Sequence, residues 1–235
     1  MDQGNLYALS EMSTDALIGP TRGGDWDDNG AWRVIHSHRF TGDNARVRDV
    51  FFGLSGVNYS ATDMLRFSPT PQQAAEARLL RALAQFWLLD LYNQVPYREP
   101  GESAVLPSKV RKGVEALDYI IAEINAIMND LPAGPVTRSN KNAAKVLLMK
   151  CYLNKGAYAN RAAPTFDAAD MQKIITLADE VMAGPYSFAA NYYDNFAPNN
   201  GAIGKENIWT QENVGGVSSG GLRSRYHAVL HYNNA

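Results

Sequence analysis

The stretch that decides the fold is PQQAAEARLLRALAQFWLLDLYN, which runs from Pro71 to Asn93. Its large apolar residues recur at the spacing of an α-helix, so the pattern predicts one long helix. They form a broad stripe that contains Leu79, Leu80, Leu83, Phe86, Trp87 and Leu91. A stripe of this width can be covered on two sides, and we therefore expect this helix at the centre of the fold.

Three more helices are predicted after this one. The first ends at Pro132, the second runs from a cap at about Ser139 to a left-handed cap at Gly156, and the third follows Asp167 and ends at Gly184-Pro185. The first also steps its apolar residues by three and four along one face, with Val114, Leu117, Ile121, Ile124, Met128 and Leu131. Four helices in succession predict an all-α fold of antiparallel pairs.

The last two predicted helices carry a degenerate repeat. Leu148, Tyr152, Gly156 and Tyr158 match the relative spacing of the leucine, tyrosines and glycine of a tetratricopeptide repeat. The later alanine and proline of the repeat fit Ala178 and Pro185 only with an insertion near residues 160–170. We therefore predict a tetratricopeptide-like helical core over residues 71–185, within a single helical domain over 1–235, and long irregular loops over residues 19–45 and 192–225.

Composition excludes several classes of protein. The 235 residues are 46% hydrophobic, with a net charge of −2 and no block of like charge, so disorder and nucleic-acid binding have no support. No apolar run is long enough to cross a bilayer. The single cysteine, Cys151, cannot form an intramolecular disulfide, and its place within a predicted helix argues against a nucleophile.

The densest polar and aromatic cluster is RGGDWDDNGAWR, residues 22–33. Sugars favour such a mixture, because their C–H faces pack on aromatic rings and their hydroxyls pair with carboxylate, amide or guanidinium groups. The alternative is a surface loop held by two buried tryptophans. The candidate ligand-binding residues are Arg22, Asp25, Trp26, Asp28, Asn29 and Trp32, with Trp209 and Tyr226 in second place.

Metal and catalytic motifs are incomplete. Asp25, Asp27, Asn29 and Gly30 follow the pattern of a calcium loop, but His36 stands where the bidentate glutamate belongs. We therefore expect no resident cofactor or metal, and an incidental calcium ion at most. His227 and His231 lack the general-base glutamate of a zinc protease, and no catalytic residue is assigned.

Five strings together resemble the SusD/RagB family of surface glycan-binding lipoproteins from Bacteroidota. They lie in the family's order and span nearly the whole chain. The strings are SEMSTD at 10–15 followed by GGDW at 23–26, EARLLRA at 76–82, LYNQVPY at 91–97, NAA at 142–144 with Tyr152-Leu153 and Gly156, and ENIW at 206–209.

The resemblance implies a helical fold of degenerate tetratricopeptide pairs and a function in nutrient uptake. Members of the family bind oligosaccharides or polysaccharides without cleaving them and cap a SusC-like TonB-dependent transporter in the outer membrane. They are longer than this chain and begin with an export signal and a lipidated cysteine. We therefore expect a truncated, N-terminal part of such a protein, with a cell-surface location that depends on a lipid anchor missing from this chain.

Two other functions remain open from the sequence. The first is a tetratricopeptide-type scaffold that binds a protein or peptide in a concave groove and needs no sugar. The second is a helical glycoside hydrolase, although no pair of carboxylates stands out at a spacing that supports hydrolysis. A non-catalytic glycan-binding protein is the leading prediction.

Overall fold

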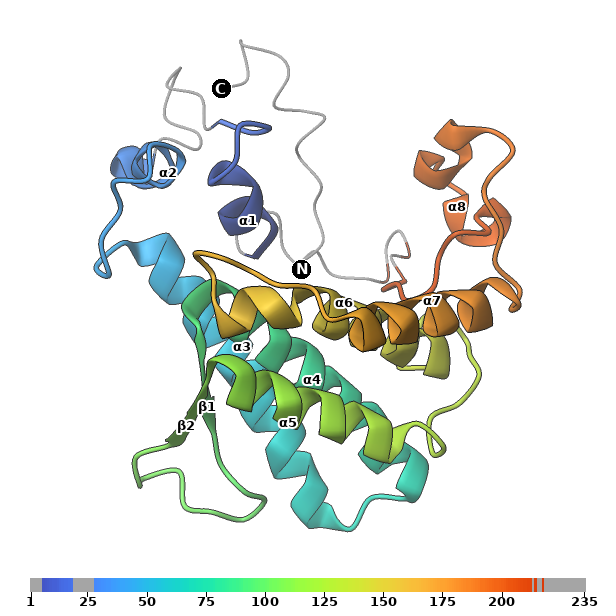
Figure 1. The fold of residues 1–235 in the computed structure, drawn as a ribbon, viewed down its shortest axis with the longest axis horizontal. Coiled ribbons are helices and arrows are strands. Elements are labelled where there is room, and N and C mark those ends of the chain that lie inside the picture. The colour runs from blue at the N-terminus through green and yellow to red at the C-terminus, as the bar shows by residue number, and fades with distance from the viewer. Residues whose placement is uncertain (1–5, 19–27, 213, 215–216, 218–235) are drawn as a thin grey trace. The chain divides into compact units, whose positions relative to one another are not determined.

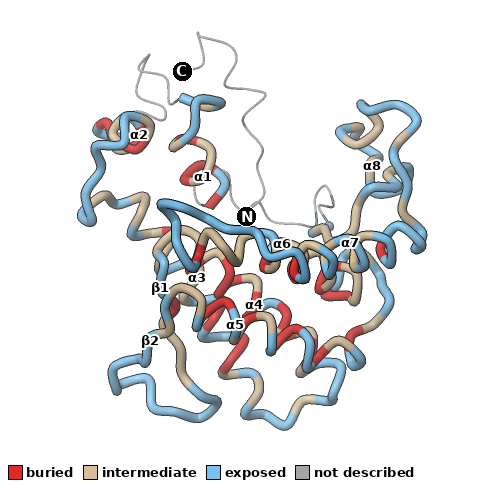
Figure 2. The backbone as a smooth tube through the Cα atoms, viewed as in Figure 1, coloured by how far each residue is buried: buried red, intermediate tan, exposed pale blue. Residues whose placement is uncertain are grey.

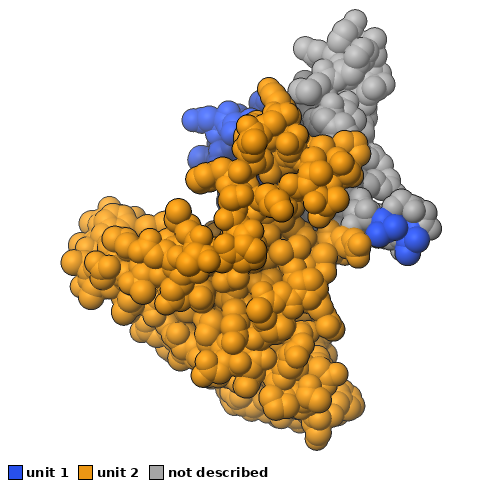
Figure 3. Space-filling view, turned by 90° about the vertical axis from the view of Figure 1, so that its right-hand side faces the viewer, with its two compact units in different colours: residues 1–53, 213–235 blue, residues 54–212 orange. Residues whose placement is uncertain are grey.

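The computed structural model describes residues 6–18, 28–212, 214 and 217. The chain divides into two compact units, Leu54–Glu212 and a smaller one that combines Met1–Gly53 with Asn213–Ala235 (Figure 3). The predicted helical core of residues 71–185 lies within the larger unit. The organisation of residues 1–235 as a single domain stays a prediction.

The central helix of the larger unit is α4 (Pro71–Tyr92), as predicted. Its first turn is fixed by a capping box, in which the Thr70 side chain accepts a hydrogen bond from the Gln73 N–H and the Gln73 side chain binds the Thr70 N–H. Asn93 ends the helix in the left-handed conformation, with φ 54°. Figure 2 shows buried residues concentrated along α4 and its neighbours.

Helices α5 (Gly113–Ile127), α6 (Lys141–Ala159) and α7 (Ala168–Met182) follow. Consecutive helices pack together, α4 with α5, α5 with α6 and α6 with α7 (Figure 1). The apolar face of α5 is fully buried at Leu117, Ile120, Ile124 and Ile127. The mostly helical fold agrees with the predicted all-α class, and α6 with α7 forms the predicted helix pair.

Two predicted caps are wrong. Asn140, not Ser139, caps α6, because its Oδ1 accepts a 2.9 Å hydrogen bond from the Ala143 N–H while its Nδ2 donates to the Ile208 carbonyl at 3.0 Å. Gly156 does not end the helix, which continues to Ala159. A Cβ atom at Gly156 would lie 1.7 Å from the Thr165 carbonyl oxygen, so glycine is needed here for close packing of the chain that follows α6.

A two-stranded hairpin interrupts the helices and was not predicted. Strands β1 (Gln94–Tyr97) and β2 (Lys109–Lys112) pair antiparallel, with Gln94 opposite Lys112 and Tyr97 opposite Lys109. The Arg111 guanidinium lies 3.4 Å from the ring centroid of Tyr97 and 3.7 Å from that of Tyr119 on α5. This stack ties the hairpin to the helical core through cation–π contacts.

Shorter elements complete the chain. The smaller unit contains α1 (Ala8–Met12), the 3-10 helix η2 (Asp28–Gly30), α2 (Ala31–His36) and the first residues of α3 (Ala45–Met64), which continues into the larger unit. Helix α2 lies in a region predicted as loop. The larger unit also contains η3 (Leu65–Phe67), η4 (Tyr192–Phe196) and α8 (Asn200–Ile203). Among the described residues, no helix is both long and apolar enough to cross a membrane.

Candidate functional site

The described part of the predicted sugar-binding loop begins with an unusual turn. Asp28, Asn29 and Gly30 have successive φ values of 43°, 56° and 80°, all in the left-handed region. Aspartate and asparagine tolerate this conformation better than most residues, and glycine adopts it freely. The turn leads directly into α2, and it brings the Asp28 carboxylate close to the side chain of Trp32.

Trp32 is an internal anchor of this loop. Its indole Nε1–H donates a 2.7 Å hydrogen bond to Asp28 Oδ2, and the residue is 1% exposed. A ring buried to this extent has no face on which a sugar could stack. The structure thus leaves no open ring face at Trp32 for the predicted stacking role, and the indole instead holds the Asp28 carboxylate.

Arg46 completes the cluster from the start of α3. Its Nη2 lies 2.9 Å from Asp28 Oδ2, and its guanidinium carbon lies 5.5 Å from the ring centroid of Trp32. The side chains of Arg46 and Asp28 are 31% and 35% exposed, so both are partly accessible to solvent. A carboxylate and a guanidinium held side by side can pair with neighbouring hydroxyls of one ligand.

Asn44 fixes the backbone at the start of α3, which carries Arg46. Its Oδ1 accepts hydrogen bonds from the Arg46 and Val47 N–H groups at 2.9 and 3.3 Å, which satisfies the first turn of α3. Its Nδ2 donates to the Ala31 carbonyl at 3.1 Å and so links α3 to α2. We call Asp28, Trp32, Asn44 and Arg46 the Asp28 cluster.

The structure covers the predicted site in part. Asp28 and Asn29 are exposed, and Trp32 is buried. Arg22, Asp25 and Trp26 lie outside the described residues, and so does the second-line candidate Tyr226; Trp209 is half-buried. The sequence analysis missed Asn44 and Arg46. The asparagine before Ala45 is a helix-start signal, but nothing in the sequence pairs Arg46 with Asp28.

Metal and nucleophile candidates can be placed as well. In the described ranges 6–18 and 28–212, no three His, Cys, Asp or Glu side chains are grouped so as to hold a metal ion. Asp25 and Asp27 of the predicted calcium pattern lie outside these ranges. Cys151 is fully buried, and desolvation raises the pKa of its thiol to about 12, so it carries no reactive thiolate near neutral pH.

A second charged cluster lies inside the larger unit. The Glu123 carboxylate on α5 accepts hydrogen bonds from Arg78 at 2.8 and 3.1 Å, and also pairs with Arg81. Burial by itself raises the pKa of Glu123, but the hydrogen bonds from Arg78 and the charge of Arg81 outweigh it and hold the pKa below its ordinary value. With its charge so compensated and only 7% exposure, Glu123 joins α4 to α5 and is not placed to act as an acid or base.

These features define a class before any relative is considered. The fold is a stack of helices with irregular segments, its cysteine is inert, and the predicted loop presents an accessible carboxylate beside a guanidinium. Such an arrangement can pair with the hydroxyls of a polar ligand.

Comparison with known proteins agrees with this class. No protein-family model matches the chain. The chain is 30% identical over 203 residues to the starch-binding protein SusD of Bacteroides thetaiotaomicron, an alignment that covers 83% of this chain and 34% of SusD.

Two solved structures share the fold. A SusD-like carbohydrate-binding protein from Bacteroides fragilis matches with a TM-score of 0.62 and 22% identity, over 86% of this chain and 44% of that one. Surface glycan-binding protein A from Bacteroides uniformis matches with a TM-score of 0.66 and 16% identity, over 87% of this chain and 46% of that one.

The chain belongs to the SusD-like family, whose members are non-catalytic binding proteins with a tetratricopeptide-like fold. It spans about a third of the length of SusD and just under half the length of the two solved structures. The family resemblance stated from five short strings is thereby confirmed.

Proposed function

We propose that this chain binds an oligosaccharide or polysaccharide at the bacterial cell surface without cleaving it. The observation that carries the proposal is its 30% identity to a protein named for starch binding. Binding of carbohydrate is implied by the family, whereas the particular glycan is left for experiment.

The loop over residues 22–33, together with Arg46, is the proposed contact surface. Asp28 supports this role because its carboxylate is partly exposed and already oriented by Trp32 and Arg46. Asn29 is exposed next to it. Arg22, Asp25 and Trp26 remain proposed contacts from the sequence pattern, and Trp26 is the proposed ring on which a sugar face stacks.

Delivery to a transporter is the second part of the proposal. The protein hands its glycan to a SusC-like TonB-dependent transporter of the outer membrane, and a lipid anchor holds it at the cell surface. Support for these finer statements comes from the family resemblance. Co-purification of the protein with a SusC-like transporter from outer membranes that contain both tests the proposed delivery. Failure of the transporter to co-purify with the protein would contradict it.

Affinity electrophoresis on a panel of polysaccharides tests glycan binding directly. We expect the wild-type protein to be retarded by at least one polysaccharide, and starch belongs in the panel because of the similarity to SusD. Trp26→Ala should reduce retardation and leave the thermal midpoint nearly unchanged. A midpoint that falls steeply would place that indole in the core. Absence of retardation in every gel would favour the peptide-binding scaffold.

A substitution in the Asp28 cluster tests the proposed sugar contact more directly. Asp28→Asn keeps the shape of the side chain but removes the charge, so binding should weaken by about three- to tenfold if the carboxylate pairs with sugar hydroxyls. Asp43→Asn is the matched control, since Asp43 is an exposed aspartate of the same unit outside the cluster. Equal binding by the two variants would remove Asp28 from the site.

A further inference from the structure

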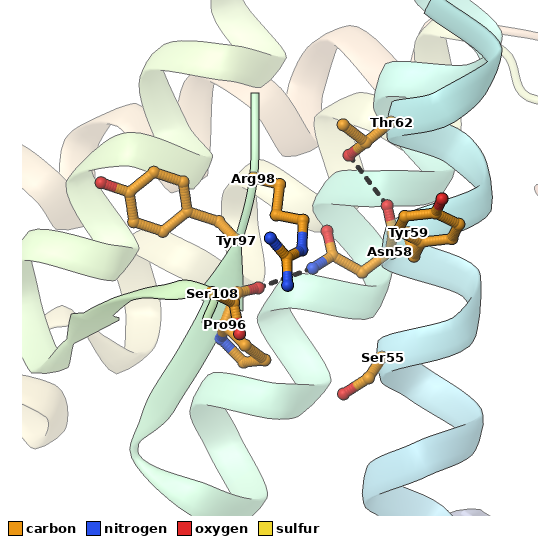
Figure 4. A pocket seen from close by; sticks show the side chains of 8 residues that line it. All are labelled: Ser55, Asn58, Tyr59, Thr62, Pro96, Tyr97, Arg98 and Ser108. Carbon is orange, nitrogen blue, oxygen red and sulfur yellow. Dashed lines mark hydrogen bonds between the residues drawn. The ribbon is translucent and has the colours of Figure 1, made fainter. Parts of the chain in front are cut away.

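A cavity of about 150 Å³ lies in the larger unit, between α3 and the strand β1 with the loop that follows it (Figure 4). Ser55, Asn58, Tyr59 and Thr62 line it from α3. Tyr97 belongs to the opposite wall. The rim reaches the surface, since Tyr59 is 46% exposed. The cavity lies entirely within residues 54–212 and shares no residue with the Asp28 cluster.

Hydrogen bonds hold the polar wall of this cavity in place. Asn58 is 6% exposed, and its Nδ2 donates a 2.7 Å hydrogen bond to the Pro96 carbonyl, which joins α3 to β1. The Asn58 Oδ1 accepts from Gln85 at 3.0 Å, and the Thr62 hydroxyl donates to the Asn58 carbonyl at 2.9 Å. A wall built this way is preorganised, which lowers the cost of binding.

Ser55 differs from the other polar side chains that line the cavity from α3. Its Oγ is buried, yet it has no hydrogen-bond partner among the described residues. Figure 4 shows the Ser55 side chain on the face of α3 that turns toward β1. Buried hydroxyls in native proteins are nearly always paired. Because Ser55 lines the cavity, a rotation of its side chain would offer this unpaired hydroxyl to a ligand.

The charge of the lining indicates the kind of ligand. The Arg98 guanidinium donates to the carbonyls of Ser103 at 2.7 Å and Ala104 at 3.2 Å, and also to that of Leu106, so it is engaged in shaping the loop. No carboxylate side chain lines the cavity. What remains is a set of hydroxyls, one amide, Pro96 and the rings of Tyr59 and Tyr97. That set suits a neutral, hydroxyl-rich molecule.

Size narrows the choice further. A cavity of about 150 Å³ can enclose benzene, and a pyranose has about twice as many heavy atoms, so the cavity would hold one edge of a pyranose ring while the rest lies at the open rim. We propose that the cavity binds a single neutral pyranose residue, as a second sugar site separate from the Asp28 cluster. The identification of the ligand as a sugar rests on the proposed glycan-binding function, while the site itself rests on the cavity and on the unpaired Ser55 hydroxyl.

The test uses the whole chain and a panel of methyl glycosides of common neutral hexoses and pentoses, observed by saturation-transfer NMR and titration. At least one should bind. Ser55→Ala should raise its Kd about five- to tenfold, the effect of one neutral hydrogen bond, without lowering the thermal midpoint, because the hydroxyl has no protein partner to lose. Ser60→Ala, an exposed serine of the same helix, should bind as wild type.

Two results would overturn the cavity site: no methyl glycoside binds, or Ser55→Ala binds as tightly as Ser60→Ala. A failure of the proposed glycan-binding function gives a different result: no polysaccharide retards the wild-type protein in affinity electrophoresis. Retardation with no monosaccharide bound would defeat the cavity site alone.

Discussion

Arg78 of α4 and Glu123 of α5 face each other across the centre of the larger unit, with Arg78 Nε 2.8 Å from Glu123 Oε1. Arg81, one turn further along α4, binds the same carboxylate. The Glu123 side chain is 7% exposed, and its charge is compensated by the guanidinium groups of Arg78 and Arg81. The pair is therefore neither an exposed surface ion pair nor a catalytic dyad. Its role is to fix how α4 and α5 pack.

The first prediction follows from this pairing. Glu123→Gln leaves two guanidinium groups without their counter-ion inside the fold, so we expect the free energy of unfolding to fall by about 3 kcal/mol. Urea denaturation measures it. Glu115→Gln on the same helix is the control, because Glu115 is exposed and should change stability little. Equal stabilities of the two variants would contradict a structural role for Glu123.

The same residue predicts a pH dependence. The pKa of Glu123 in the folded protein lies below its ordinary value of 4.5, because the arginines outweigh the burial. The unfolded chain therefore binds more protons in the range between the two values, and stability is lost as the pH falls from about 4.5 through the folded pKa. Wild type should lose more unfolding free energy than Glu123→Gln between pH 6 and pH 3, measured by urea titration at each pH. Parallel losses would show that Glu123 is not responsible.

Gly156 gives a third prediction. Alanine is ordinarily the better residue in a helix, by about 1 kcal/mol. At Gly156 its Cβ would lie 1.7 Å from the Thr165 carbonyl oxygen, so the backbone must move and we expect a net loss of about 1–3 kcal/mol. Gly56→Ala on α3 meets nothing within 4 Å and should be neutral or stabilising. Thermal denaturation compares the two, and a stabilised Gly156→Ala would disprove the close approach.

Trp32 supplies the fourth. Trp32→Phe removes the N–H that binds Asp28 and part of a ring that is 1% exposed, so stability should fall by about 1–3 kcal/mol. Phe40→Ala, at a ring of the same unit that is 46% exposed, should cost much less. Chemical denaturation distinguishes them. A Trp32→Phe variant of wild-type stability that binds glycan poorly would restore Trp32 as a direct sugar contact.

Local sequence signals were sufficient for the helices from α4 to α7, whereas the long helix α3 (Ala45–Met64) was not predicted. The apolar stripe of α4 and the Gly184-Pro185 stop after α7 depend on residues close together in the chain, so periodicity and end signals located them. Ser139 and Asn140 are both good helix caps. Contacts with distant segments distinguish them, because the Asn140 amide donates to the Ile208 carbonyl and the Ser139 hydroxyl donates to the Glu76 carbonyl. The role of Gly156 likewise depends on a later segment that passes over it.

The candidate site was predictable in composition but not in geometry. The run of carboxylates, amide and indoles pointed to the loop, yet nothing local shows that Trp32 turns inward or that Arg46 pairs with Asp28. The cavity that contains Ser55 was invisible for the same reason, because its walls come from α3 and from residues beyond α4. Contacts between segments that are distant in the chain could not be predicted from local sequence patterns.

Isothermal titration of the wild-type chain with the polysaccharide that retards it most tests the central claim most directly, provided the sugar is examined afterwards for new reducing ends. We predict saturable heat of binding, a marked loss of affinity in Asp28→Asn but not in Asp43→Asn, and a polysaccharide recovered intact. Reducing ends released in proportion to protein, or no heat with any polysaccharide of the panel, would contradict a non-catalytic glycan-binding protein.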